Sequence, residues 1–170
     1  LIVALIVMAL CSLIGVITAF IMARYNFPGK NIFRIALLIP MLATPFVNAY
    51  VIGKFFHPKV GIINLILYDI LHLLPYRIDI NGLAGIILAQ TLSYYPIVYL
   101  NVLASLINID PSMEEQGENL GARRFTLFRT ITFPLSLPGL AAGATIVFIF
   151  SMEDLGGPIG FIGYSANPLA

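Results

Sequence analysis

Four long apolar segments dominate the sequence, and the stretches between them carry most of the charged residues. The apolar segments are residues 1–23, 35–52, 83–103 and 135–152. Each has ~18 residues or more, about the length that a helix needs to cross a bilayer. Three of them contain prolines, which membrane helices tolerate because neighbouring groups satisfy the carbonyls that proline leaves unpaired. The pattern therefore predicts an all-α transmembrane bundle of about four spans.

The three connections differ in length and composition. Residues 24–34 form a short basic connection, and residues 104–134 form a longer one that is rich in both charges. The connection 53–82 contains an apolar stretch, 62–74, of ~13 residues, which is too short to span. We expect an interfacial or re-entrant helix there.

The composition confines the chain to the membrane class. Of the 170 residues, 59% are hydrophobic and only 10% are charged, and the mean hydropathy is +0.96. Soluble domains carry about 25% charged residues, so the composition excludes a soluble globular domain, a disordered chain and a nucleic-acid-binding protein. The single cysteine, Cys11, rules out a disulfide framework and a cysteine-based metal site. The chain begins without methionine, and we expect a single domain over 1–170 that is a fragment with elements missing at both ends.

The distribution of basic residues predicts the orientation. Connections 24–34 and 104–134 lie on one side of the membrane and carry six Lys and Arg residues, against three on the other side. Cytoplasmic loops are enriched in Lys and Arg. We therefore expect 24–34 and 104–134 to be cytoplasmic.

Connection 104–134 has the pattern of two short helices that meet at a glycine. Asp110 and Pro111 are typical of an N-cap and a first helical position, and the helix is expected to run to about Leu120. Gly121 then acts as a C-terminal breaker. This arrangement suits a docking surface for a soluble partner, and the alternative is a plain amphipathic loop on the membrane.

A second amphipathic helix is expected over 122–133. Phe125, Phe128 and Ile131 recur at three-residue steps and predict one apolar stripe. Pro134 is expected to end this helix, and Pro138 to start the next span.

The same loop resembles the cytoplasmic signature of type I ATP-binding-cassette importer permeases. That signature is Glu-Ala-Ala, three residues, Gly, nine residues, then Ile-x-Leu-Pro. Glu115, Gly121, Ile131 and Pro134 match it in register. Gln116 and Gly117 replace the two alanines and Phe133 replaces the leucine, which leaves the detail of the partner contact open. The resemblance extends over residues 1–158.

The resemblance implies a fold, a location and partners. The fold would be a permease bundle in the cell inner (plasma) membrane, with a coupling helix in loop 104–134 and with outer helices missing from this chain. The partners would be a cytoplasmic ATP-binding subunit dimer, a second permease unit (fused or separate), an extracytoplasmic solute-binding protein and membrane lipid. The residues implied in ATPase coupling are Glu114, Glu115, Gly117, Gly121, Ala122, Ile131 and Pro134.

The sequence itself offers no catalytic constellation. It lacks a phosphate-binding Gly-x-x-x-x-Gly-Lys-Ser/Thr loop, so ATP hydrolysis is expected in a separate subunit, and we expect no enzyme activity, cofactor or metal site. The alternative function is a secondary transporter or channel subunit without an ATPase partner, because proline-broken helices also occur there. The loop with Glu115, Gly121 and Pro134 favours the importer.

Four polar residues in or beside the spans are candidates for the substrate path: Glu153, Asp154, Gln90 and Asn48. Within the spans, Gln90 and Asn48 either line the path or form hydrogen bonds across helices. Acids near membrane depth are costly and often functional, although Glu153 and Asp154 could instead be a solvated pair at the outer interface. Residues 152–158 resemble the acidic-x-Gly-x-Pro stretch of ferric-iron, polyamine and aminophosphonate permeases. The resemblance is greatest to the ferric-iron type, which implies ferric iron as the first candidate substrate.

Overall fold

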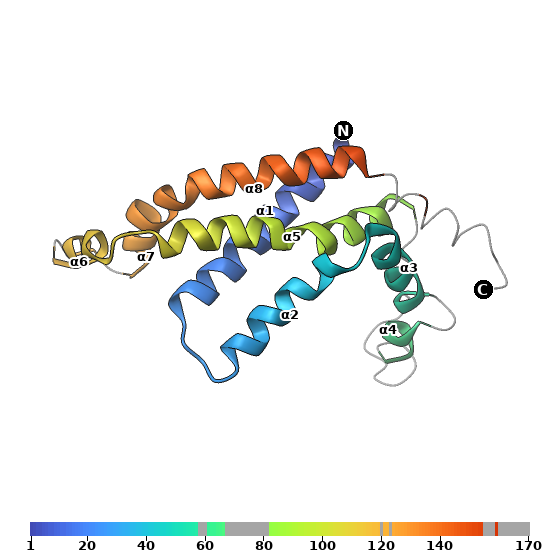
Figure 1. Ribbon diagram of the computed structural model, residues 1–170, viewed down its shortest axis with the longest axis horizontal. Helices are drawn as coiled ribbons and strands as arrows, with labels where there is room; N and C mark the ends of the chain where they lie inside the picture. The colour runs from blue at the N-terminus through green and yellow to red at the C-terminus, as the bar shows by residue number, and fades with distance from the viewer. Residues whose placement is uncertain (58–60, 67–81, 120, 123, 155–158, 160–170) are drawn as a thin grey trace.

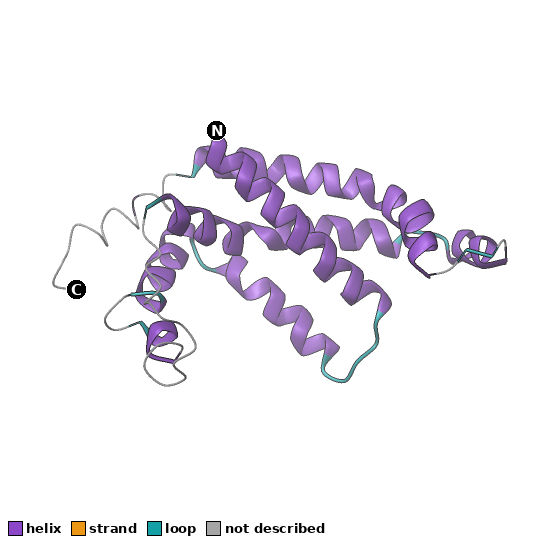
Figure 2. Ribbon diagram, turned by 180° about the vertical axis from the view of Figure 1, so that it is seen from behind, coloured by secondary structure: helices purple, strands orange, loops and turns teal. Residues whose placement is uncertain are grey.

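The computed structural model describes residues 1–57, 61–66, 82–119, 121–122, 124–154 and 159. All regular elements in these ranges are helical, as Figure 2 shows. They are α1 (Ile2–Arg24), α2 (Lys30–Leu42), α3 (Pro45–Phe55), α4 (Ile62–Asn64), α5 (Leu83–Ile107), α6 (Pro111–Asn119), α7 (Arg124–Leu127), the π-helix η2 (Phe128–Thr132) and α8 (Phe133–Glu153).

Helices α1, α5 and α8 pack against one another and form the core of the bundle (Figure 1). On α1 and α8 the buried positions follow a spacing of three or four residues, so each of these helices turns one stripe inward, whereas the middle of α5 is buried on most of its sides. On α1 this stripe is Ala4, Val7, Cys11, Gly15, Ala19 and Met22, and on α8 it is Ser136, Gly139, Gly143, Val147 and Ser151. The stripes consist largely of small side chains, as expected where membrane helices approach closely.

Glycines set the distance between these helices. Val98 of α5 is fully buried. A Cβ on Gly15 would lie 2.8 Å from the Cβ of Val98, and a Cβ on Gly143 would lie 2.9 Å from its Cα. Helices α1 and α8 can therefore approach α5 this closely because neither carries a side chain at these two positions.

The predicted span 35–52 is occupied by two helices instead of one straight helix. Helices α2 and α3 meet at 104°, and together they are long and apolar enough to form one broken span or a re-entrant loop. The break lies before Pro45, whose ring disfavours helical backbone at the preceding residue. Thr44 is accordingly extended, with ψ 151°, and its side chain accepts a hydrogen bond from the backbone N–H of Val47 at 3.4 Å.

Proline does not end the helix before the last span, which corrects the expected boundary at Pro134 and the expected start at Pro138. Residues 128–153 are continuous, and α8 begins at Phe133. In η2 the backbone N–H of Phe133 donates to the carbonyl of Phe128. This wider π turn precedes Pro134, which sits in the first turn of α8, where its missing N–H costs little.

Within the described residues, three helices are long and apolar enough to cross a membrane, or four if α2 and α3 count as one span. The three are α1, α5 and the continuous segment Phe128–Glu153. Of the apolar stretch expected over 62–74, the structure describes 62–66, which include α4, and the rest lies outside the described residues.

Candidate functional site

The helix α6 begins with the side-chain cap that the sequence predicts. The Asp110 carboxylate accepts a hydrogen bond from the backbone N–H of Ser112 at 2.9 Å. The backbone N–H of Met113 donates to the Asp110 carbonyl at 3.1 Å. Two of the N–H groups that a helix start leaves unpaired are thus satisfied.

The other end of α6 is closed by Gly121. This residue has φ +85°, and the backbone N–H of Ala122 donates to the carbonyl of Gly117 at 3.0 Å. A left-handed residue with this bond is the Schellman pattern of helix termination. Because no atom lies within 4 Å of a Cβ built on Gly121, glycine is required here for its backbone conformation and not for space.

Gly117 lets α6 fold back on the segment that follows. A Cβ on Gly117 would lie 2.7 Å from Cδ1 of Ile131 and 2.8 Å from Cδ1 of Leu127. The apolar stripe predicted over 122–133 is therefore only partly correct. Ile131 does face α6, but it does so together with Leu127, which the prediction did not include. The spacing of four between these two residues was the available signal. The side chains of Glu114 and Phe125 lie outside the described part of the structure.

The helices α6 and α7 with η2 form one unit, residues 110–132, which we call the elbow, and α1 anchors it. The rings of Phe20 and Phe128 meet edge to face, with centroids 4.8 Å apart. The Arg24 guanidinium donates to the hydroxyl of Thr132 at 3.4 Å, and Thr132 is 1% exposed. The connection after α1 and the elbow therefore lie at the same end of the bundle, which agrees with their predicted common side.

Removal of the Asp110 cap is expected to loosen the start of α6. Asp110→Ala should speed amide exchange at Ser112, whereas Asp110→Asn, which keeps an acceptor, should largely preserve protection. The hydrogen bond from Ser112 lowers the pKa of Asp110 below its ordinary 3.8. The cap therefore stabilises α6 fully at pH values above the ordinary pKa of 3.8. This stabilisation is lost as the pH falls through the lower pKa that Asp110 has in the folded helix. Equal amide exchange at Ser112 in the wild type, Asp110→Ala and Asp110→Asn would contradict the capping role of Asp110.

A second polar cluster lies at the opposite end of the long helices. Gln90 of α5 is 2% exposed and donates from Nε2 to the Asp154 carboxylate at 2.9 Å. The Ser151 hydroxyl of α8 donates to Oε1 of the same glutamine at 2.6 Å. The Tyr94 phenol lies close enough to Asp154 to interact with its charge. Two of the four candidate path residues, Gln90 and Asp154, thus meet in one hydrogen-bonded network, in which Gln90 is buried and Asp154 is half-buried.

The other two candidates lie elsewhere. Asn48 donates from Nδ2 to the carbonyl of Pro40 at 2.9 Å and to the Ser93 hydroxyl at 2.7 Å. Pro40 lies in the last turn of α2, where helix carbonyls generally lack partners within the helix, so the bond from Asn48 joins α3 to the end of α2 across the bend. Glu153 is exposed. Among the described residues, no group of three His, Cys, Asp or Glu side chains is arranged to hold a metal ion.

Comparison with known proteins gives a consistent result. Residues 2–166 match the family model described as "Binding-protein-dependent transport system inner membrane component". The chain is 30% identical over 151 residues to the molybdenum transport system permease protein ModB of Escherichia coli K12, covering 87% of this chain and 62% of the relative. It is 29% identical over 144 residues to the spermidine/putrescine transport system permease protein PotC of the same strain, covering 85% and 48%.

A third relative matches a shorter region. The chain is 41% identical over 78 residues to the ferric transport system permease protein FbpB of Actinobacillus pleuropneumoniae, covering 46% of this chain and 11% of the relative. The chain thus spans 62% of the length of the molybdenum permease of E. coli K12 and less of the other two.

Proposed function

The chain belongs to the inner-membrane components of binding-protein-dependent transport systems, the permeases of type I ATP-binding-cassette importers, and we propose that it forms the solute path and docks a cytoplasmic ATPase through its elbow. The family assignment makes it a multi-pass protein of the inner membrane whose relatives are transport subunits and not enzymes. It also favours an importer over a secondary transporter or channel.

The docking proposal rests mainly on the way in which both ends of α6 are capped. The helix has a side-chain cap at its start and a Schellman bond at its end. Both views show it beyond the end of the long helices (Figures 1 and 2). Its Glu115 is exposed. A short helix that is closed at both ends and packs on η2, which α1 anchors, can transmit a displacement of the ATPase to the bundle without fraying.

Copurification tests this proposal directly. The full-length permease should retain a soluble ATPase subunit in detergent, and Glu115→Gln should weaken that retention. Glu153→Gln is the matched control, because it removes the same charge at the other end of the bundle and should leave retention unchanged. Failure of the wild-type permease to retain an ATPase under conditions that preserve its fold would contradict the assignment.

The remaining partners follow from the importer architecture. We propose that a second permease unit, fused or separate, and lipid cover the apolar outer surface, and that a solute-binding protein delivers the substrate at the far side. The exposure of large side chains on α2 supports a covering partner, since Ile32 is 74% exposed and Leu42 is 85% exposed. ATP-binding subunits would act as a dimer beneath the two elbows.

We further propose that the substrate is a cation, with ferric iron as the first candidate and a polyamine as the next. The support is the network around Asp154, where a carboxylate is held by the buried Gln90. A carboxylate in the path repels an oxyanion such as molybdate and attracts a cation. The molybdenum permease matches more of this chain than the ferric permease does. The choice of a cation over an oxyanion as substrate therefore depends on the charge of Asp154 and needs a direct test.

Uptake by a charge-neutralised variant provides that test. Glu153→Gln/Asp154→Asn should lower uptake of ferric iron or spermidine by roughly tenfold or more, because loss of ~1.4 kcal/mol of attraction is tenfold in binding. Stimulation of the ATPase should persist. Ser151→Ala is the control, since it removes a hydrogen bond to Gln90 and keeps both charges. Unchanged cation uptake, or uptake of molybdate by the wild type, would contradict the proposal.

A further inference from the structure

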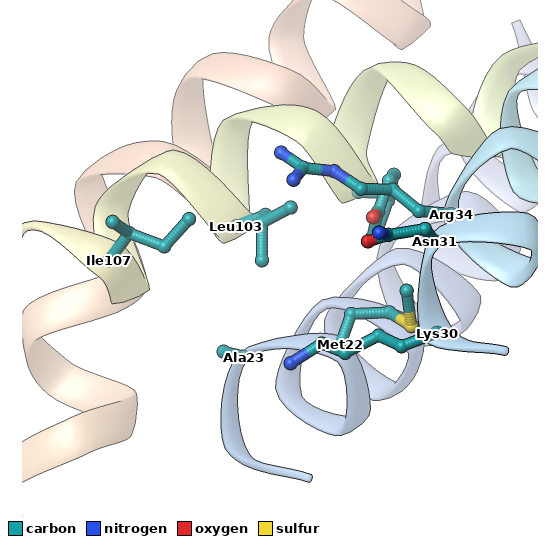
Figure 3. A pocket seen from close by; sticks show the side chains of 8 residues that line it. Met22, Ala23, Lys30, Asn31, Arg34, Leu103 and Ile107 are labelled. Carbon is teal, nitrogen blue, oxygen red and sulfur yellow. The ribbon is translucent and has the colours of Figure 1, made fainter. Parts of the chain in front are cut away.

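A small pocket opens between α1, α2 and α5, at the end of the bundle that carries the elbow (Figure 3). Its volume is ≈ 180 Å³. Met22 lies in the last turns of α1, Lys30 is the first residue of α2, and Ile107 is the last residue of α5. The pocket thus lies where these helices end, which in a membrane is the level of the lipid headgroups.

The polar part of the pocket is cationic. Lys30 and Arg34 are four residues apart on α2 and therefore share one face of that helix. In Figure 3 the Arg34 side chain extends from α2 toward the side of the pocket that α5 forms, and the Lys30 side chain extends along the α1 side, past Met22 toward Ala23. Lys30 Nζ also donates to the amide oxygen of Asn26 at 3.0 Å. The lining contains these two cations and no acidic residue, so an anion is the ligand that its charge favours.

Tyr99 gives independent reason to expect a ligand. This residue of α5 lines the pocket and is 0% exposed. Its hydroxyl is buried and makes no hydrogen bond of normal geometry with any described residue, although it lies close to the Arg34 guanidinium. Buried hydroxyls are nearly always paired, because leaving one unpaired is costly. An acceptor that enters the pocket would take this hydrogen bond.

The rest of the lining is apolar and determines the kind of anion. Met22, Leu103 and Ile107 border the pocket together with the cations. The cavity is smaller than the roughly 300–1,000 Å³ of pockets that enclose a drug-sized molecule, so it can take a phosphate group but not a whole lipid. A phospholipid would place its phosphate between Lys30 and Arg34 and leave its acyl chains outside, in the hydrocarbon.

We propose that this pocket binds the phosphate of an anionic phospholipid in the leaflet on the elbow side. Lys30 and Arg34 neutralise the charge, and Tyr99 donates a hydrogen bond to a phosphate oxygen. Basic pockets between membrane helices are suited to such headgroups. The site is separate from the elbow and from the Gln90–Asp154 network, so it holds whether or not the chain transports the proposed substrate.

Native mass spectrometry of the full-length permease tests the site. The protein is delipidated and titrated with dioleoyl phosphatidylglycerol, with dioleoyl phosphatidylcholine, and with inorganic phosphate as competitor. Phosphatidylglycerol should bind saturably. Lys30→Gln or Arg34→Gln should weaken it about 5-fold each, and the double variant about 30-fold, since each basic residue near an anionic surface contributes by about that factor. Lys54→Gln on α3 is the matched control and should bind like wild type.

The thermal stability of Tyr99→Phe, measured with and without lipid, gives a second test. It distinguishes a Tyr99 hydroxyl that binds the lipid phosphate from one that only stabilises the fold. Without lipid this variant should unfold at the same temperature as wild type or higher, because it removes an unpaired buried hydroxyl. With phosphatidylglycerol present, it should gain less thermal stability than wild type.

Three results would overturn the proposal. The first is equal phosphatidylglycerol binding by wild type and the Lys30→Gln/Arg34→Gln variant. The second is displacement of phosphatidylglycerol by inorganic phosphate at comparable concentration, which would identify a soluble anion as the ligand. The third is the absence of saturable phosphatidylglycerol binding to the wild type, which would mean that another part of the full-length protein fills the pocket.

Discussion

Replacement of Gly121 by valine is expected to lower ATP-coupled uptake strongly while the permease still inserts and folds. Gly121 has φ +85°, a backbone conformation that is strongly unfavourable for a β-branched residue. Holding valine there costs about 1–3 kcal/mol, which lowers the equilibrium constant between the native and the distorted elbow by roughly 5- to 150-fold. We expect uptake in proteoliposomes to fall by up to that factor.

Two further variants separate coupling from general stability. Gly121→Asn should retain most uptake, because asparagine tolerates the left-handed conformation better than other residues with a side chain. Gly29→Val imposes comparable strain at φ +84°, also with no atom within 4 Å of a Cβ, but in the connection before α2. It should lower thermal stability and leave coupling intact. Normal substrate-stimulated ATPase activity and uptake in Gly121→Val would refute the role assigned to α6.

Replacement of Gly139 by valine is expected to cause the largest loss of stability in the bundle. A Cβ at this position would lie 2.5 Å from the backbone carbonyl oxygen of Asn101 and would also clash with the Ser105 hydroxyl. A serine rotamer can change, but the carbonyl belongs to α5 and moves only if the helices separate. Overpacking of this kind costs typically 1–3 kcal/mol and sometimes more. Fluorescence-detected gel filtration after heating should show early loss of the folded peak.

The control for this prediction lies on the same helix. Ala142 is exposed, so Ala142→Val adds a β-branched side chain to α8 without entering the α5 contact. Gly139→Ala should fall between Ala142→Val and Gly139→Val. If all three variants unfolded at the same temperature as wild type, the close packing of α8 on α5 would not be a source of stability.

The features that the sequence analysis predicted correctly depend on neighbours a few residues away. The cap at Asp110 and the end of α6 at Gly121 are formed by bonds within five residues. Hydrophobic length likewise predicted α1 and α5 because a membrane span needs only a sufficient apolar run. The match to the importer signature, from Glu115 to Pro134, is another local property, and the family comparison supports it.

The features that the sequence analysis missed depend on residues far apart in the chain. The pairing of Gln90 with Asp154 joins residues 64 positions apart, and the Arg24–Thr132 bond joins residues 108 positions apart. The continuation of the last span through Pro134 was also missed, because a π turn just before a proline leaves no signature in the hydrophobic pattern. For Asn48 the sequence left open a place in the substrate path or a bond across helices. The structure shows the bond, to Ser93 of α5 and to the Pro40 carbonyl, and the position of Asn48 depends on the bend between α2 and α3.

The π-helix η2, which ends the elbow, fixes the rotational phase between α6–α7 and the last span. Successive residues of an α-helix are rotated by ~100° about its axis, and the wider π turn already holds one more residue than an α turn, so a further residue inserted after it would turn every side chain of α8 by about that angle. Upstream of η2, Leu127 faces Gly117, and downstream Gly139 and Gly143 face α5. Insertion of one residue after Thr132 would therefore keep one of these contact faces in place only by turning the other away. By this geometry, the junction between the elbow and α8 should tolerate almost no insertion.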